Sequence, residues 1–182
     1  ISFLDVSTGD FFVAGGVINY IDQLLSNFHP SEVILQRKKI HWFNEHFLEK
    51  YYCNTFDDWV FAPDFANELL LKQFGTASLK GFGVEDLPMG IIAAGAVLYY
   101  LQDTQHNQTA NITSISRIEK DKYVWLDKFT IRNLEIIGSP NENAKTLIDV
   151  IDNTITPMGS RMLRRWVLMP LKDVKPIEER QN

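Results

Sequence analysis

The sequence Ile1-Ser-Phe-Leu-Asp-Val-Ser-Thr-Gly-Asp-Phe-Phe-Val-Ala14 contains two short apolar runs on either side of a polar turn. The runs are Ile1–Val6 and Asp10–Ala14, and Ser7-Thr-Gly9 lies between them. Two strand-like runs joined by a short turn that contains glycine are typical of a β-hairpin. The sequence therefore predicts that the chain begins with two antiparallel strands.

The next segments alternate between helical and extended patterns. Apolar residues at helical spacing predict helices, and short apolar runs rich in β-branched or aromatic residues predict strands. The predicted helices are 17–28, 40–50 and 63–72, with Pro63 in the first turn of the third helix and Gly75 ending it, and the predicted strands are 33–35 and 51–55. The order β-β-α-β-α-β-α indicates the α/β class, with one mixed sheet flanked by helices.

The chain after residue 88 changes character along its length. A helix is predicted from Pro88 to about Gln105, and the polar segment Asp103–Asn111 follows it. We therefore place a domain boundary at residue 111, which gives domains 1–111 and 112–182. Two short strands predicted over 112–118 and 123–126 could belong to either domain. The boundary therefore lies between residue 111 and about residue 126.

Residues from Asp127 onward have a helical pattern interrupted by polar loops, which predicts the beginning of an all-α domain. Thr156 is a good N-cap, Pro157 suits the first helical position, and Pro170 ends the last clear helix. One face of this helix carries an apolar stripe of Met158, Met162, Trp166 and Met169. We expect helices outside this chain to cover the stripe, because both ends of the chain look like cuts within a longer protein.

Composition excludes several classes of protein. The 182 residues are 45% hydrophobic and 23% charged, as in globular domains, and the single cysteine cannot form an internal disulfide. The longest apolar run, Met89–Leu101, is shorter than the roughly 20 residues of a membrane-spanning helix. Residues 1–110 carry a net charge of −7 and the remainder +2. This balance argues against a wide DNA-binding face, because affinity for nucleic acid depends mainly on phosphate neutralisation.

Asp5 is the strongest candidate for metal chemistry, because it lies in the first predicted strand beside Asp10. Two-metal hydrolysis needs three or four converging carboxylates. The later strands contain none, and only Glu32 and Asp57-Asp58 flank them. We favour a turn-forming role for Asp5, in which its carboxylate accepts hydrogen bonds from backbone amides near Gly9. The alternative is a metal-dependent nuclease that uses Asp5.

Other possible sites are weaker. His41 and His46 are five residues apart, so they do not align on one helical face as zinc ligands would. The glycine-rich segment Gly75–Gly83 lacks the Gly-Lys-Ser/Thr ending of a phosphate-binding loop, which favours a flexible connector. The arginines of the last clear helix could bind the phosphates of a nucleic acid. Three cations are few for binding a DNA duplex, so we favour a solvated or ion-paired face of a scaffold helix. The three arginines are Arg161, Arg164 and Arg165.

Longer strings resemble the MutS family of DNA mismatch-repair proteins over essentially the whole chain. Residues 3–11 (Phe-Leu-Asp-Val-Ser-Thr-Gly-Asp-Phe), Gln73-Phe-Gly-Thr76, Gly81-Phe-Gly-Val-Glu85 and Ala93-Ala-Gly95 resemble the connector domain of this family. The segments 126–135 and 154–171 resemble the opening of its core, or lever, domain. Those two strings are long enough to be specific.

The resemblance implies an RNase H-like connector followed by the start of a helical lever domain. It implies an internal, non-catalytic fragment of a cytoplasmic bacterial ATPase, one that passes conformational signals between mismatch recognition and ATP hydrolysis. Mismatched DNA, ATP, Mg²⁺ and the partner subunit of a homodimer would bind the parent protein through domains outside this chain. No cofactor, metal or catalytic residue is expected within it. MutL is the partner that the connector would contact.

The predicted helix 63–72 is where we look for the MutL contact. Phe65, Leu69 and Leu70 can bury one side of this helix on the sheet. The polar positions predicted to face outward and to bind the partner are Asn67, Glu68, Lys72 and Gln73, beside the 75–83 loop. Loops and helix faces on rigid α/β scaffolds often carry recognition.

Overall fold

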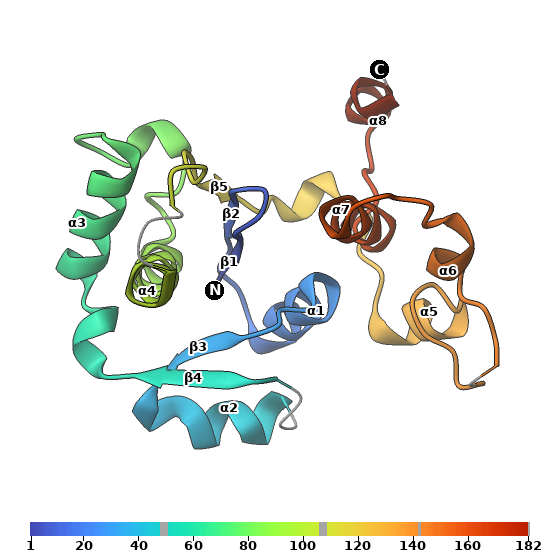
Figure 1. Cartoon of the computed structure of the whole chain (residues 1–182), viewed down its shortest axis with the longest axis horizontal. Coiled ribbons are helices and arrows are strands. Elements are labelled where there is room, and N and C mark those ends of the chain that lie inside the picture. The colour runs from blue at the N-terminus through green and yellow to red at the C-terminus, as the bar shows by residue number, and fades with distance from the viewer. Residues whose placement is uncertain (48–50, 106–108, 142, 182) are drawn as a thin grey trace. The chain divides into compact units, whose positions relative to one another are not determined.

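A computed structural model of the chain describes residues 1–47, 51–105, 109–141 and 143–181, which fall into two compact units (Figure 1). The first unit comprises Ile1–Asp22 and His29–Ile118. The second comprises Gln23–Phe28 and Glu119–Asn182. Helix α1 (Ile18–Phe28) therefore contributes residues to both units.

The predicted hairpin at the beginning of the chain is confirmed. Strands β1 (Ser2–Asp5) and β2 (Asp10–Val13) pair antiparallel, with Phe3 opposite Phe12. Phe3, Phe11 and Val13 are buried, because alternate residues of each strand face the core. A third short strand, β5 (Ser116–Arg117), pairs in parallel with β2.

The sheet differs from the single mixed sheet that the sequence predicts. Strands β3 (Val33–Gln36) and β4 (Cys53–Phe56) form a parallel pair of their own, and within the described residues they are not bonded to the β1–β2–β5 sheet. Helix α4 (Pro88–Gln105) contacts β1, β2 and β3, so apolar side chains rather than backbone hydrogen bonds connect the strands of the two sheets. The mixed α/β class itself is confirmed.

The helices of the first unit match the predicted ones. They are α1, α2 (Ile40–Phe47), α3 (Pro63–Phe74) and α4, and residues 48–50 of the predicted helix 40–50 lie outside the described residues. Short 3-10 turns occupy Arg37–Lys39, Asp58–Phe61, Lys80–Phe82 and Lys120–Lys122. Helix α3 ends as predicted at Gly75, which adopts a left-handed conformation that glycine tolerates without a steric cost.

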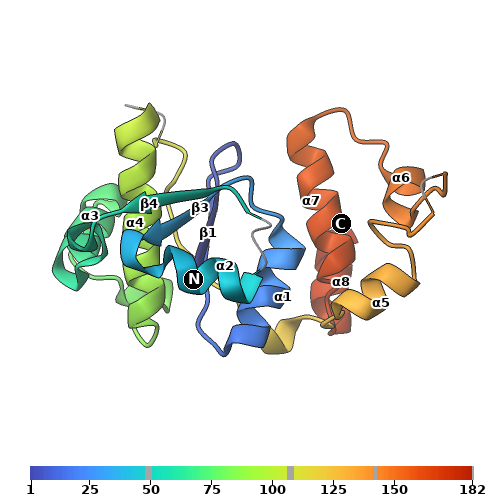
Figure 2. The same ribbon diagram turned by 90° about the horizontal axis from the view of Figure 1, so that it is seen from below.

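Helices α3 and α4 form the most extensive helix contact of the first unit (Figure 2). A Cβ atom on Gly95 would lie 2.4 Å from the Cβ atom of Ala66, so this contact requires the small residues that the sequence places there. Leu70 and Leu98 are fully buried beside it. They belong to a continuous core with Val13, Val84, Ile112 and Ile115.

The segment 75–83 is more ordered than the flexible connector that its glycines predict. Leu79 is buried in the core, and the rings of Phe74 and Phe82 pack with centroids 5.0 Å apart. The 3-10 turn Lys80–Phe82 lies between these contacts. Two apolar residues, Leu79 and Phe82, anchor this otherwise polar segment, which composition alone does not reveal.

The second unit is mainly helical, as predicted, and contains α5 (Lys128–Asn133), α6 (Leu147–Ile151), α7 (Pro157–Leu168) and α8 (Val174–Gln181). Thr156 caps α7 by accepting a hydrogen bond from the Gly159 amide at 3.1 Å. The predicted strand 123–126 is wrong, because only Tyr123 makes an isolated antiparallel bridge, to Leu171. Of the predicted strand 112–118, only β5 pairs. Ile112, Ile115 and Ile118 are buried at a spacing of three, which does not suit a strand.

No helix within the described ranges is both long and apolar enough to cross a membrane.

Candidate protein-interaction site

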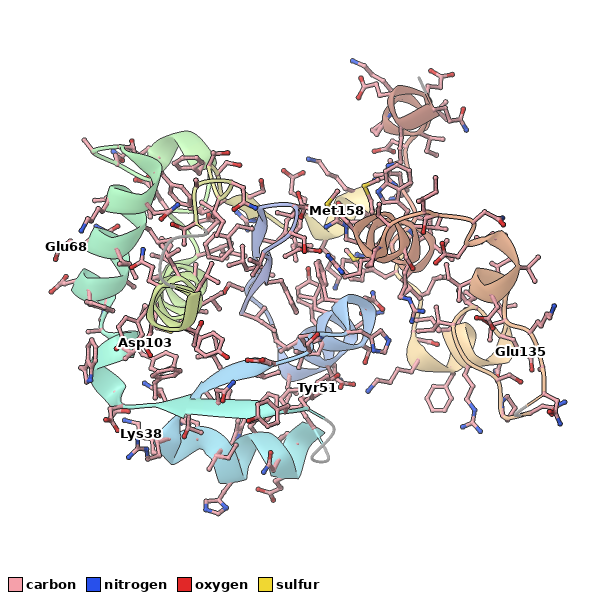
Figure 3. All side chains as sticks on the ribbon, in the orientation of Figure 1. Lys38, Tyr51, Glu68, Asp103, Glu135 and Met158 are labelled. Atoms are coloured by element: carbon pink, nitrogen blue, oxygen red, sulfur yellow. The ribbon has the colours of Figure 1, made fainter. Side chains whose placement is uncertain are left out.

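The outer face of α3 presents three of the four residues predicted to bind a partner. Asn67, Glu68 and Lys72 are exposed, and Figure 3 shows Glu68 on the side of α3 that faces away from α4. On the inner side Leu70 is fully buried, while Phe65 and Leu69 are half-buried. The helix therefore buries one side, and its polar side is available to a partner.

Gln73 has a different environment from the other three residues. It is half-buried, and its Nε2 atom donates hydrogen bonds to the carbonyl oxygens of Thr109 at 2.8 Å and Ile112 at 3.0 Å. The prediction that Gln73 faces outward is therefore corrected, because its amide is the donor that satisfies two backbone carbonyls. Of the four predicted residues, the exposed polar face of α3 therefore contains Asn67, Glu68 and Lys72.

The Asp5 carboxylate lies in the turn of the hairpin. Its Oδ1 atom accepts hydrogen bonds from the amides of Ser7 at 2.9 Å and Thr8 at 3.4 Å. The Thr8 hydroxyl in turn accepts from the Asp10 amide at 3.2 Å. These contacts agree with the turn-forming role that the sequence favours for Asp5.

The carboxylates that flank the later strands are occupied by local partners. Glu32 accepts hydrogen bonds from the Tyr100 hydroxyl and from Asn54 Nδ2, the latter at 2.9 Å. The hydrogen bond to Glu32 is the main cause that raises the pKa of Tyr100 to about 12, with smaller contributions from burial and charge. Glu32 therefore holds β4 and α4 together.

Asp57 and Asp58 follow β4 and pair with the basic residues that follow β3. Arg37 lies 3.3 Å from Asp57, and Lys38 lies 2.6 Å from Asp58. Within residues 1–47, 51–105, 109–141 and 143–181, no three His, Cys, Asp or Glu side chains are grouped as metal ligands. The nuclease alternative that uses Asp5 has no support in this arrangement.

Arg164 of α7 lies near two acidic side chains of the second unit, Asp149 and Asp152. Asp149 forms a capping box with Thr146, and Asp152 accepts hydrogen bonds from the hydroxyls of Ser160 and Thr154. These hydrogen bonds are the main cause that lowers the pKa of both carboxyl groups, and the nearby charge of Arg164 adds to the effect. For Arg164, this arrangement supports the scaffold role that the sequence favours.

The apolar stripe of α7 is exposed at one end and covered at the other. Met158 and Met162 are exposed, whereas Met169 is buried and Trp166 is half-buried beneath the Arg180 guanidinium, 4.6 Å from its ring centre. Figure 3 shows Met158 on α7. Ile155, just before the helix, is fully exposed. An exposed apolar patch of this kind often marks an interface.

The first unit has a second exposed surface that the sequence does not predict. Five aromatic side chains from β4, the 3-10 turn 58–61, α3 and α4 pack edge to face, and we call this group the aromatic surface. Its members are Phe56, Trp59, Phe65, Tyr99 and Tyr100. The only sequence signal was the aromatic content of 56–65, because Tyr99 and Tyr100 come from a distant helix.

Comparison with known proteins places these units in a family. The family description MutS domain II matches residues 1–113, and MutS domain III matches residues 129–182. The chain belongs to the MutS family of DNA mismatch-repair proteins. The two matches cover successive MutS domains along the chain, and Gln23–Phe28 of the second unit fall within the first match.

Relatives from several bacteria support this assignment. The chain is 58% identical over 182 residues to the DNA mismatch repair protein MutS of Parabacteroides distasonis, which covers the whole chain. It is 56% identical over 180 residues to that of Phocaeicola vulgatus and 55% identical over 180 residues to that of Flavobacterium johnsoniae, each covering 99% of the chain. The chain spans 21% of the length of each of these MutS proteins.

Proposed function

We propose that this chain is the connector and the beginning of the lever of a MutS-type mismatch-repair ATPase. Its role is to transmit conformational signals between mismatch recognition and ATP hydrolysis. The observation that carries the proposal is the colinear match to MutS domains II and III within one chain. We further propose an RNase H-like arrangement for the first domain and a boundary between residues 111 and 126, which the compact unit ending at Ile118 supports.

Helix α1 supports the signalling role. Its first residues belong to the first unit and Gln23–Phe28 belong to the second. Gln23 Nε2 donates a hydrogen bond to the carbonyl oxygen of Leu126 at 3.0 Å, which fixes the second half of the helix within its own unit. The two ends of one helix thus belong to different units, which supports the proposed signalling role.

We propose that the polar face of α3, formed by Asn67, Glu68 and Lys72, is where MutL binds. Polar, exposed side chains on a helix that is anchored by a buried inner side form a rigid surface for recognition. The carboxylate of Glu68 and the ammonium of Lys72 supply opposite charges four residues apart, which would fix the orientation of a partner.

The test is a charge exchange on α3. The double variant Glu68→Arg/Lys72→Glu should weaken capture of the chain by immobilised MutL at least about fivefold, because two favourable charge contacts become unfavourable. Its melting temperature should stay within a few degrees of the parent's, because exposed substitutions shift stability by only about 0.5 kcal/mol.

The matched control exchanges the charges of an exposed pair elsewhere in the first unit, Lys39→Glu/Glu45→Arg. This variant has the same net charge and should bind MutL like the parent chain. If the α3 variant folds normally and is captured as well as the control, α3 is not the MutL site.

We propose that the parent protein binds mismatched DNA, ATP and Mg²⁺ in the bacterial cytoplasm as a homodimer, through domains beyond this chain, and that this chain is not catalytic and holds no cofactor. The absence of a phosphate-binding loop motif in the sequence supports this proposal. The test is an assay for ATP hydrolysis and for Mg²⁺- or Mn²⁺-dependent cleavage of RNA–DNA hybrids. Turnover that disappears in Asp5→Asn would contradict the proposal.

A further inference from the structure

The aromatic surface carries an indole that is half open to solvent. Trp59 is 53% exposed, although it packs edge to face against Phe65 and Tyr99 with ring centroids 5.2 Å away in each case. Tyr99 in turn contacts Phe56 at 5.7 Å. One face of Trp59 is therefore held rigidly while other parts of the ring remain available. Rigid, partly exposed tryptophans are enriched among the residues that dominate binding energy at protein interfaces.

The charge around Trp59 is mainly acidic. Asp64 precedes Phe65 in the first turn of α3, and Asp103 lies one turn beyond Tyr99 on α4; both are exposed. Neither carboxylate has a partner among the described residues. The basic side chains that reach the turn before Trp59, Arg37 and Lys38, are paired with Asp57 and Asp58. The rim of the aromatic surface therefore attracts cations and repels phosphate.

A second exposed tryptophan of the same unit lies among charges of both signs. Trp42 on α2 is 48% exposed and stacks on His46 with centroids 4.5 Å apart. The exposed Lys39 lies three residues before it and the exposed Glu45 three residues after it. Trp42 therefore serves as a comparison for Trp59, because both indoles are about half exposed while the charges beside Trp42 are mixed.

We propose that the aromatic surface docks a protein segment that carries arginine or lysine. The cation lies over the exposed indole of Trp59, where the negative face of the ring attracts it, and Asp64 and Asp103 pair with neighbouring basic side chains. The acidic rim disfavours DNA and anionic membranes as occupants. The surface uses residues other than Asn67, Glu68 and Lys72, so the proposal does not depend on MutL binding at α3.

The test uses the indole N–H resonances of the whole 182-residue chain, which contains four tryptophans at positions 42, 59, 125 and 166. The probe is the peptide acetyl-Gly-Arg-Gly-Arg-Gly-Arg-Gly-amide, and the same peptide with glutamate in place of arginine is its control. The arginine peptide should shift the Trp59 resonance, which Trp59→Phe identifies, more than the other three. Affinity should fall about threefold to tenfold in Asp64→Asn/Asp103→Asn, since each lost exposed charge pair is weak.

Two control variants keep the result interpretable. Asp121→Asn/Asp173→Asn removes the same net charge from the second unit and should leave the affinity unchanged. Trp42→Phe should also leave it unchanged. Well-dispersed spectra of every variant show that it folds.

Several outcomes would overturn the proposal. They are no shift at millimolar peptide, equal shifts of Trp42 and Trp59, or a Trp59 shift caused by a single-stranded oligonucleotide but not by the arginine peptide. A Trp59 resonance that moves on dilution of the chain alone would assign the surface to a second copy instead, and would equally contradict a basic partner.

Discussion

The α-carbon of Gly9 lies directly against the backbone carbonyl of Asn111: a Cβ atom on Gly9 would be 2.2 Å from the Asn111 oxygen. The two residues are about a hundred positions apart in sequence, and Asn111 Nδ2 also donates a hydrogen bond to the Val6 carbonyl at 2.7 Å. Gly9 has a positive φ of 76°. The turn of the first hairpin is therefore fixed both by its own conformation and by the segment that leads into β5.

Gly9→Ala should destabilise the first unit by more than about 2 kcal/mol. The substitution adds the cost of a left-handed alanine, about 1 kcal/mol, to a clash with backbone that has no flexible side chain to move. Urea unfolding followed by circular dichroism measures the loss. Gly75→Ala is the control, because Gly75 has a similar φ of 62° but open space around it. Equal losses in the two variants would show that the contact with Asn111 is unimportant.

Gly95→Ala should destabilise the chain although alanine favours a helix by about 1 kcal/mol over glycine. The added methyl group would overlap Ala66 at the crossing of α3 and α4. The double variant Gly95→Ala/Ala66→Gly should recover only part of the loss, because it removes the Cβ atom of Ala66 but leaves its α-carbon 2.5 Å from the added methyl group. Additive effects of the two single changes in a double-mutant cycle would argue against a direct contact.

Gln73→Ala should lower the free energy of unfolding by about 1–3 kcal/mol, because two carbonyl groups lose their donor. Asn67→Ala, on the exposed face of the same helix, should change it by no more than about 0.5 kcal/mol. Urea unfolding of the two variants side by side provides the comparison. A neutral Gln73→Ala would mean that water replaces the amide and that Gln73 is available to a partner after all.

The second unit should lose stability in acid before the first unit does. Hydrogen bonds to the backbone and side chain of Thr130 lower the pKa of Asp127, and hydrogen bonds to neighbouring residues likewise lower the pKa of Asp149 and of Asp152. Because these folded-state values lie below the unfolded ones, the stabilisation is complete above about pH 4 and is lost as pH falls through the folded values. The pH dependence of the Trp125 and Trp166 indole resonances, compared with those of Trp42 and Trp59, measures the difference.

Replacing the three carboxylates by amides checks the cause. Asp127→Asn/Asp149→Asn/Asp152→Asn should flatten the acid dependence of the second unit while lowering its stability at neutral pH. If the acid transition of the second unit is unchanged in this variant, other groups control it.

The exposed apolar residues of the second unit should cause self-association of the isolated chain. Ile155 is fully exposed, and Met158 and Met162 are exposed close to it in sequence. Ile155→Lys/Met162→Lys should shift sedimentation toward monomer at high concentration without lowering the melting temperature. Val17→Lys, at an exposed apolar residue of the first unit, should have no such effect. A parent chain that stays monomeric at high concentration would contradict this expectation.

Features that depend on neighbours along the chain follow from the sequence alone. The hairpin 1–14, the order of helices and strands up to α4, the end of α3 at Gly75 and the cap at Thr156 all follow from short-range periodicity and turn chemistry. The turn-forming role of Asp5 belongs to the same group, because its partners are two and three residues away. The resemblance to the MutS family can also be recognised from the sequence, because contiguous stretches of residues carry it.

Features that depend on residues far apart in sequence could not be predicted without the fold. Gln73 is a polar residue of the kind usually found at the surface. Its side-chain amide nevertheless donates hydrogen bonds to backbone carbonyl groups 36 and 39 positions away. The division of the strands into two sheets and the single bridge at Tyr123 likewise depend on distant partners. The aromatic surface around Trp59 joins residues from separate helices. Side-chain type sets what a residue can bind, whereas the packing of the whole chain sets which partner comes within reach.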